Sequence, residues 1–224
     1  MSEAAIAELE KLQRRHDRNV RVAHARGLLD GIASMLRPGD VAVDCGANVG
    51  EVTAVLAATG ATVHCFEPDP FAFGKLSKRF GAARNVTLHQ AAVGLRAGQI
   101  TLMRAANFAD NPRGGSVKST VIAGGRGIDE GDAAGIAVDM IDFPAFLRGL
   151  IDAHGDIAFL KMDIEGAELD ILEEMERQDL FAPIRLTVAE THERKFKALR
   201  PRFRALKERV AATFPTTKVN LDWI

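Results

Sequence analysis

Apolar and polar stretches alternate along the 224-residue chain in a way that predicts a repeating order of strands and helices. Short apolar runs bounded by polar turns are typical of strands buried on both faces. We expect such strands at 41–44, 61–66, 85–89, 157–162 and 184–189. Helical periodicity between them predicts helices at 51–58, 70–80 and 167–175. This order predicts an α/β fold with a mostly parallel, twisted sheet and helices on both faces.

Both ends of the chain continue the pattern. Residues 1–37 are helical in periodicity, with an apolar stripe at residues 6, 9 and 12 and a second stripe at residues 28, 29, 32 and 36. We expect them to form a helical extension packed on a single domain at 38–224. The last segment, 218–223, alternates like a strand that completes the sheet.

The pattern changes between residues 97 and 135, where glycine and asparagine are frequent and little is apolar. One strand-like run, 99–103, stands within this stretch. Long segments of this kind in a compact domain are often functional loops. We therefore predict a loop insert that covers the site, in preference to a disordered segment.

The turn after the first predicted strand is the most informative segment. Gly46 and Gly50 can adopt backbone angles that other residues avoid, so the chain can turn sharply and bring its amides close to a ligand. A helix follows the turn, and the next strand ends at Glu67. Strand, glycine turn, helix, strand and acid is the order of a βαβ nucleotide-binding unit. The sequence thus predicts a nucleotide-type cofactor at the tip of the first strand.

Side chains of the turn narrow the choice of cofactor. A dinucleotide needs glycine at the positions of Asn48 and Glu51, because pyrophosphate approaches the backbone there. Asp44 would repel phosphate but could hold an ammonium group. Glu67 could accept hydrogen bonds from ribose hydroxyls. S-Adenosylmethionine carries ribose, an ammonium group and a sulfonium without phosphate, so the turn favours it over NAD(P).

Charged residues also follow two further strands at the same edge of the sheet. Lys161, Asp163 and Glu165 end one strand, and Glu190 and His192 follow the next. Ligands of open parallel sheets bind outside the carboxyl ends of the strands, so we expect these side chains near the cofactor. Lys161 beside Asp163 implies an ion pair, a role behind a metal site or a polarised substrate group.

His192 and Asp163 are the candidate general bases, since an imidazole with a pKa of about 6.5 takes up a proton near neutral pH. Lys161 and Glu190 complete the candidate catalytic set. A second hypothesis is that Asp163, Glu190 and His192 bind one divalent cation that activates a substrate hydroxyl. Glu168 is either a charge at a helix start or part of the site.

Composition and charge narrow the class of partner. The formal net charge is −1, which gives no electrostatic reason to expect nucleic acid or an anionic membrane. No apolar run approaches the roughly 20 residues of a membrane span, and the polar start is unlike a secretory signal, so we expect a cytoplasmic protein. Residues 194–207 are basic, but apolar residues recur there at helical spacing. This pattern favours a solvated helix face over a nucleic-acid surface and leaves an anionic substrate as an alternative.

Four segments together resemble the successive motifs of the FkbM-type methyltransferases: VDCGANVG, CFEPDP, NVTLHQAAVG and FLKMDIEGAELDIL. The resemblance runs from about Asp30 to His192, and Lys-x-Asp-x-Glu-Gly-x-Glu is its most specific part. It implies a Rossmann-like class I methyltransferase fold and S-adenosylmethionine as cofactor. It also implies O-methylation of a sugar, a glycan or a natural product.

By this resemblance, the cofactor-binding residues are Asp44, Gly46, Ala47, Asn48, Gly50, Glu67, Pro68, Gln90, Ala91 and Asp163. The glycine turn would surround the methionine part, Glu67 the ribose, and Gln90 and Ala91 the adenine. Asp163 would lie where the methyl group and the acceptor meet.

Two alternative functions stay open. An RNA or protein methyltransferase on the same fold would need an aromatic platform, and the chain has no tyrosine and the single tryptophan Trp223. An NAD(P)-dependent oxidoreductase is opposed by Asn48 and Glu51. The identity of the acceptor and the oligomeric state, a homodimer included, are also open.

Overall fold

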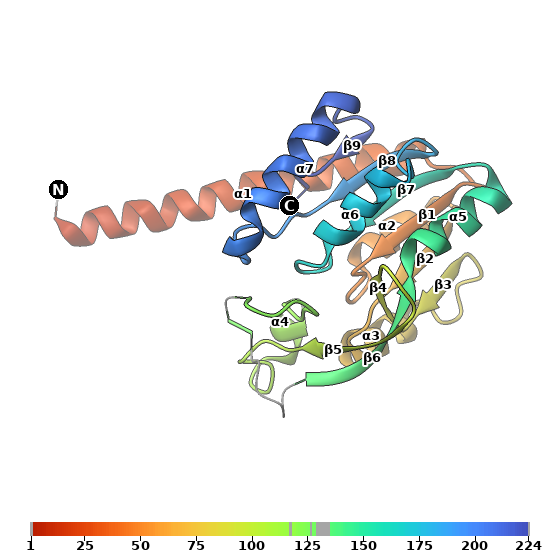
Figure 1. The fold of residues 1–224 in the computed structure, drawn as a ribbon. Coiled ribbons are helices and arrows are strands. Elements are labelled where there is room, and N and C mark those ends of the chain that lie inside the picture. Colours follow the sequence, from red (N-terminus) through yellow and green to blue (C-terminus); the bar gives the residue numbers. More distant parts are fainter. Residues whose placement is uncertain (1, 117, 126, 129–134, 224) are drawn as a thin grey trace.

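The computed structural model describes residues 2–116, 118–125, 127–128 and 135–223, and its centre is one sheet of parallel strands (Figure 1). The strand order is β3-β2-β1-β7-β8-β9. The strands are β1 Val41–Cys45, β2 Thr62–Phe66, β3 Val86–His89, β7 Ile157–Met162, β8 Ile184–Ala189 and β9 Val219–Asn220. The predicted Rossmann-like α/β fold is confirmed.

The sheet is buried on both faces because successive side chains of a strand point in opposite directions. Val41 and Val43 of β1 join one core, and Ala42 between them joins the other. The first core packs against α5 Phe143–His154, α6 Glu168–Arg177 and α7 Arg200–Thr213. The second packs against α2 Glu51–Ala58, α3 Pro70–Phe80 and the C-terminal end of α1 Glu3–Met35.

Helix α1 packs on the domain along its last third only. Leu29, Ile32 and the following Leu36 are buried, so the second apolar stripe of the sequence meets the core. The first stripe is exposed, and this part of the helix projects away from the body (Figure 1). None of the described helices is both long and apolar enough to cross a membrane.

A second sheet lies between β3 and β7 in the chain, and the sequence did not predict it. Its strands are β4 Ala92–Gly94, β5 Gly98–Met103 and β6 Gly135–Asp142, in the order β4-β6-β5. The short helix α4 Pro112–Ser116 follows β5. The segment predicted as a loop at 97–135 therefore contains regular structure, and its residues 117, 126 and 129–134 lie outside the described part.

The basic segment near the C-terminus forms α7, and its apolar stripe is buried as predicted. Two arginines of its charged face pair with acids of α6. Arg202 pairs with Asp170 and Glu173, and Arg209 pairs with Glu176. These pairs fit a solvated helix face and not a surface that collects phosphates.

Candidate active site

The carboxyl ends of β1 and β7 meet at the point where the strand order reverses, which is where ligands of open α/β sheets bind. The two ends are in direct contact, since the Asp163 amide donates to the Cys45 carbonyl at 3.1 Å. Gly46 has a φ of +75°, and a Cβ on it would lie 1.8 Å from the carbonyl oxygen of Asp163. Only glycine fits this position, which explains the first glycine of the turn.

Lys161 holds this turn from behind. Its side chain is 5% exposed, and its ammonium group donates to the Gly46 carbonyl at 2.9 Å and to the Cys45 carbonyl at 3.3 Å. It also lies 3.4 Å from Asp44 and 3.5 Å from Asp163. Burial lowers the pKa of Lys161, but the two carboxylates outweigh burial and raise it. Lys161 therefore remains a charged anchor, and this placement differs from the catalytic role considered from sequence.

Asp44 supports the turn in the same way. It is fully buried, accepts a hydrogen bond from Thr53 at 2.7 Å and faces the Lys161 ammonium group. The sequence suggested that Asp44 binds the ammonium group of a ligand, but the lysine already occupies that role. Lys161 and Asp44 are paired because both side chains are buried and each compensates the charge of the other.

A narrow pocket of about 80 Å³, here called the inner pocket, opens at this edge of the sheet. Residues after β1, β2, β3 and β7 form its base, and residues of the second sheet and its loops cover it. Its charged lining residues are Glu67, Asp163 and Glu165, and no lysine or arginine among the described residues lines it. Phe66, Pro68 and small or branched apolar side chains make up most of the rest.

Glu67 is buried at the base of the inner pocket. Its carboxylate accepts hydrogen bonds from the amides of Asn48 at 2.8 Å and Asp69 at 2.9 Å. Burial raises the pKa of Glu67 to about 7, although both hydrogen bonds lower it. Asn48 itself has a φ of 49°, so the turn adopts a left-handed conformation to place this amide.

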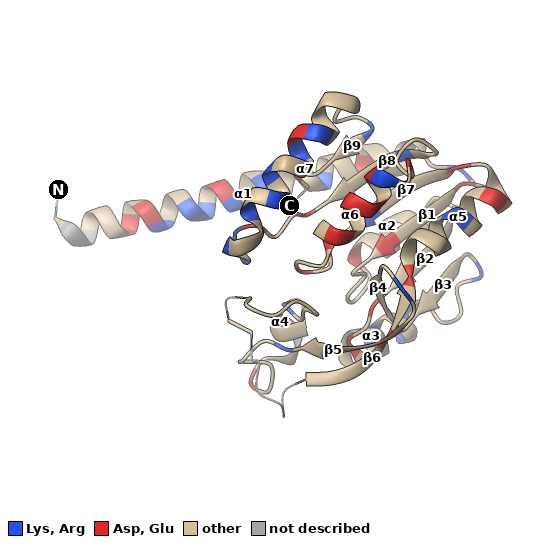
Figure 2. Cartoon of the chain, viewed as in Figure 1, with Lys and Arg blue, Asp and Glu red and all other residues tan. Residues whose placement is uncertain are grey.

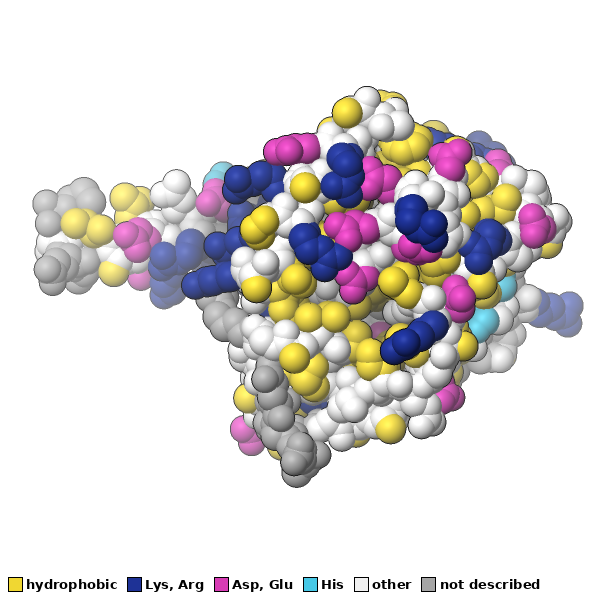
Figure 3. Space-filling view, in the orientation of Figure 1, with side chains coloured by type: hydrophobic (Ala, Val, Ile, Leu, Met, Phe, Trp, Pro, Cys, Tyr) yellow, Lys and Arg dark blue, Asp and Glu magenta, His cyan; other side chains and the backbone are white. Residues whose placement is uncertain are grey.

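Two contacts fix the cover of the inner pocket to its base. The Thr120 hydroxyl donates to the Glu165 carbonyl at 2.7 Å. The Arg104 guanidinium group donates to both oxygens of buried Asp69, at 3.0 and 3.2 Å, and lies 4.0 Å from the ring centre of Phe108. Figure 3 shows hydrophobic side chains gathered in the hollow between this cover and the main body.

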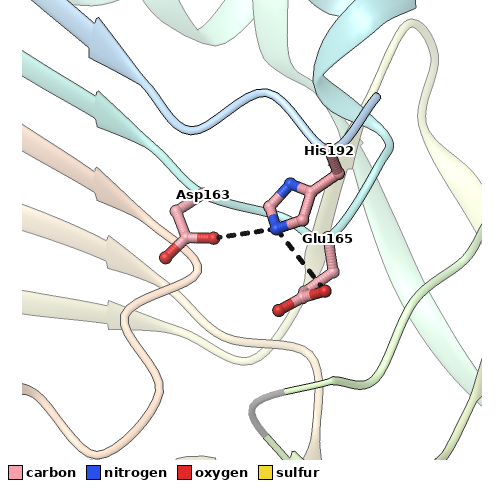
Figure 4. A group of neighbouring side chains, drawn as sticks. All are labelled: Asp163, Glu165 and His192. Carbon is pink, nitrogen blue, oxygen red and sulfur yellow. Dashed lines mark ion pairs between the residues drawn. The ribbon is translucent and has the colours of Figure 1, made fainter. Parts of the chain in front are cut away.

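His192 joins the site from the loop after β8 and faces several carboxylates (Figure 4). Its Nε2 atom lies 3.5 Å from Glu165, 3.8 Å from Asp163 and 3.9 Å from Glu190. Its Nδ1 atom lies 3.0 Å from Glu168. Burial lowers the pKa of His192, but Glu168 and the other carboxylates raise it to about 9. A raised pKa favours the protonated imidazole near neutral pH, which weighs against His192 as the general base.

Glu168 orders the loop that carries Asp163 and Glu165. It is fully buried and accepts hydrogen bonds from the amides of Ile164 at 2.8 Å and Gly166 at 2.9 Å. With His192 it makes a third contact. The sequence left open whether Glu168 is only a helix-start charge, and these contacts make it part of the site.

The geometry bears on the hypothesis that Asp163, Glu190 and His192 bind a divalent cation. Asp163, Glu165 and His192 offer ligand atoms within 4.8 Å of one another, whereas Glu190 of the predicted set is outside this group. Lys195 already pairs with Glu165 at 2.7 Å, and His192 holds a proton. A divalent cation needs deprotonated ligands and would have to displace both positive charges. The residues as arranged therefore do not fit a resident metal ion.

A broad groove of about 680 Å³, here called the outer groove, adjoins the inner pocket and shares Glu165 with it. Glu190 and His192 line its inner end. Its walls include Arg21 of α1 and Trp223, the single tryptophan. Burial raises the pKa of Glu190 to about 7, and the neighbouring Asp163 adds to this effect.

The remaining predicted cofactor-binding residues differ in whether they line the inner pocket. The inner pocket is lined by Gly46, Asn48, Glu67, Pro68, Ala91 and Asp163 of the predicted cofactor set. Gln90 is exposed and does not line it, and Gly50 faces Leu76 and Phe80 in the core. Ala47 lies on the outer side of the turn with Val49.

The segment predicted to cover the site does contribute to the inner pocket, but the sequence singled out none of its lining residues: Leu102, Ser116, Ser119, Thr120 and Val121. These residues belong to a segment that matches no motif. The one usable signal is the alternation of apolar residues at Ile100 and Leu102, which indicates a strand with one buried face.

Two solved structures are similar to parts of this chain. A structure described as methyltransferase FkbM from Methylobacillus flagellatus KT is 24% identical, with a TM-score of 0.34, and the match covers 64% of this chain and 31% of that chain. A structure described as an rRNA methylase from Streptococcus thermophilus is 15% identical, with a TM-score of 0.42, covering 81% and 78%. The chain thus spans about a third of the length of the first structure. No curated protein matches the chain.

The family comparison covers the region that contains the inner pocket. The model of the methyltransferase FkbM domain matches residues 44–210, from the end of β1 to the last turns of α7. This is well over half of the 224 residues, and it includes the glycine turn, the inner pocket and the His192 loop. The chain therefore belongs to the FkbM methyltransferase family.

Proposed function

We propose that the protein transfers a methyl group from S-adenosylmethionine to a hydroxyl oxygen of a small molecule or glycan. The charge of the inner pocket is the observation that carries this proposal, because its lining has three carboxylates and no lysine or arginine. A pyrophosphate would meet only negative charge there, whereas a sulfonium and an ammonium group would be attracted. This favours S-adenosylmethionine over NAD(P).

Each part of such a cofactor has a matching group in the pocket. Glu67 offers the remaining lone pairs of its carboxylate to ribose hydroxyls. Phe66, Pro68 and Ala91 offer apolar surface to the adenine. Asp163 lies at the border with the outer groove and favours the positively charged end. S-Adenosylmethionine would supply a methyl group on a sulfonium, which is a good leaving group.

The protein must then align the acceptor oxygen and remove its proton. Glu190 lines the outer groove near Asp163 and has a pKa of about 7, so it can accept a proton near neutral pH. We assign the role of base to Glu190. Asp163 positions the acceptor hydroxyl, and protonated His192 keeps the carboxylates in place.

The inner pocket is too narrow for the cofactor as it stands. Ligand sites are typically about 300 to 1,000 Å³, against about 80 Å³ here. The cover carrying Arg104 and Thr120 therefore has to move outward before a cofactor enters and can close again over it.

RNA is a less well supported acceptor. Two of the arginines of α7 that could bind phosphates, Arg202 and Arg209, are paired with acids of α6. Among the described residues that line the outer groove, Trp223 is the one Phe, Tyr or Trp side chain. Proteins that bind single-stranded RNA usually stack several bases on aromatic side chains.

Calorimetric titration tests the cofactor assignment without knowledge of the acceptor. We expect S-adenosylhomocysteine to bind and NAD and NADP not to bind. Glu67→Gln should weaken S-adenosylhomocysteine binding at least about tenfold, because the charged partner of the ribose is lost. The exposed Glu208→Gln variant is the matched control and should bind as the parent protein does. Binding of NAD alone would overturn the proposal.

Kinetics test the base once a hydroxylated acceptor has been found by screening. Glu190→Gln should lower kcat by about 10² to 10⁴ with little change in cofactor affinity. His192→Gln should lower kcat less, since His192 is not the proton acceptor. A larger loss for His192→Gln than for Glu190→Gln would reverse the two roles.

A further inference from the structure

The outer groove contains two kinds of cation. Lys195 pairs with Glu165 at 2.7 Å, and Lys207 pairs with Glu193 at 3.0 Å and Asp222 at 2.8 Å. These two lysines are neutralised within the protein. They leave little positive charge for a ligand.

Three other cations line the same groove: Arg21, Lys118 and Arg194. All three are exposed, and none forms an ion pair with an acidic side chain in the described part of the chain. They come from α1, from the cover of the inner pocket and from the loop after β8. Three separate elements thus bring unpaired positive charge to one groove.

Some other cations of α1 and α7 are paired with acids. Arg14 of α1 pairs with Glu10, and Arg202 and Arg209 of α7 pair with acids of α6. Figure 2 shows basic and acidic residues interspersed along α1. Unpaired arginines also occur elsewhere in the described part of these helices, so what distinguishes the groove is that it brings together three such cations from separate elements.

The two ends of the groove differ in sign. Its inner end holds Glu165 and Glu190, and its outer walls hold the three unpaired cations. A molecule with a neutral hydroxyl at one end and an anionic group at the other would be oriented by this difference, because the reverse orientation would place its anion against the carboxylates.

We propose that the acceptor carries a carboxylate or phosphate group, which binds Arg21, Lys118 and Arg194 while the hydroxyl lies at Glu190. This inference rests on the proposed methyl transfer and names the class of acceptor for it. It also gives α1 a role, since Arg21 of this helix forms part of the acceptor site. Arginine suits such a role because its planar group binds carboxylates and phosphates through two hydrogen bonds.

Trp223 provides a direct measurement, because it is the only tryptophan and lines the groove. Its fluorescence is followed while glucose, glucuronic acid and glucose 6-phosphate are added separately at constant ionic strength. We expect a saturable change with one or both anionic sugars and none with glucose. The response to carboxylate against phosphate then identifies the preferred anion.

The variant Arg21→Gln/Arg194→Gln should weaken the binding of the anionic sugar about tenfold. Arg18→Gln/Arg84→Gln is the matched control, since both arginines are exposed and lie outside the groove. Unchanged binding in the first variant, equal weakening in the control, or no saturable change with either anion would overturn the inference.

Calorimetry with S-adenosylhomocysteine on the same samples separates the two proposals. Cofactor binding without anion binding contradicts only the acceptor class. Anion binding to the groove without cofactor binding supports an anion site and contradicts the methyl-transfer proposal.

Discussion

The inner pocket and the outer groove meet at Glu165, yet they are built in opposite ways. The inner pocket depends on backbone: a glycine against a carbonyl, and carboxylates that accept from amides. Its supporting ions, Lys161 and Asp44, are buried behind it. The outer groove depends on exposed side chains of three separate elements, with unpaired cations on its walls.

This difference separates two kinds of specificity. A cofactor shared by many acceptors can be recognised by fixed backbone groups, and a change there disturbs the fold as well as the site. An acceptor is recognised by side chains that can vary while the fold stays the same. Substitutions in the inner pocket should therefore lower stability and binding together, and those in the groove should affect binding alone.

Gly46→Ala should have the largest effect. Its Cβ would lie 1.8 Å from the Asp163 carbonyl, and its φ of +75° is unfavourable for alanine. We expect a loss of at least about 4 kcal/mol in the free energy of unfolding, or failure to fold. Urea denaturation measures the loss, and calorimetry should show no S-adenosylhomocysteine binding.

Gly149→Ala in α5 is the matched control for this change, because a Cβ there would have no neighbour within 4 Å. It should stabilise the protein by roughly 0.5 to 1 kcal/mol, as expected within a helix. If Gly46→Ala had the same free energy of unfolding and the same cofactor affinity as the parent protein, the close approach of β1 and β7 would not be a requirement of the site.

Lys161→Met should have the second largest effect on stability. It leaves the buried Asp44 carboxylate without its cation, at a cost of about 3 kcal/mol in the free energy of unfolding. The exposed Lys78→Met variant should change stability by less than about 0.5 kcal/mol. Normal stability of Lys161→Met combined with lost turnover would instead favour the catalytic role suggested by the sequence.

The sequence predicts the central sheet well because its signals are local. Helices α2 and α3 begin and end at the residues that their periodicity predicts, and the acids after β7 lie at the strand end as expected. These features follow from neighbouring residues, so no knowledge of distant contacts is needed.

The roles of charged residues could not be read in the same way. Asp44 and Lys161 are 117 positions apart, and only the pairing of β1 with β7 turns them into an ion pair. The pKa of His192 depends on burial, on Glu168 and on the carboxylates of Glu165 and Asp163 in the loop after β7. The second sheet was missed for a similar reason, because β6 pairs with β5 across a segment with no strong pattern.

Arg104→Ala tests the cover of the inner pocket. The change removes both hydrogen bonds to buried Asp69 and the contact with Phe108, so the cover closes less firmly over a bound cofactor. We expect about tenfold weaker S-adenosylhomocysteine binding in calorimetry. Arg96→Ala in the same region is exposed and should bind as the parent protein does. Equal affinities for both variants would show that the cover does not contribute to cofactor binding.

The smallest expected effect is the pH dependence of stability caused by His192, which lies where the inner pocket and the outer groove meet. His192 has a pKa raised from about 6.5 to about 9, so the folded state binds its proton more tightly than the unfolded chain does. The stability from this group is fully present below about pH 6.5 and is lost as the pH rises through about 9. Because the group is partly exposed and its partners are screened, we expect a loss of about 1 kcal/mol across this range.

Urea denaturation between pH 6 and pH 10 measures this dependence. His192→Gln keeps a polar side chain beside Glu168 but cannot be protonated, so its stability should fall less with pH than that of the parent protein. The exposed His16→Gln variant on α1 should follow the parent curve. Parallel curves for the parent and His192→Gln would mean that His192 is neutral in the fold, and His192 would again be a candidate for the base.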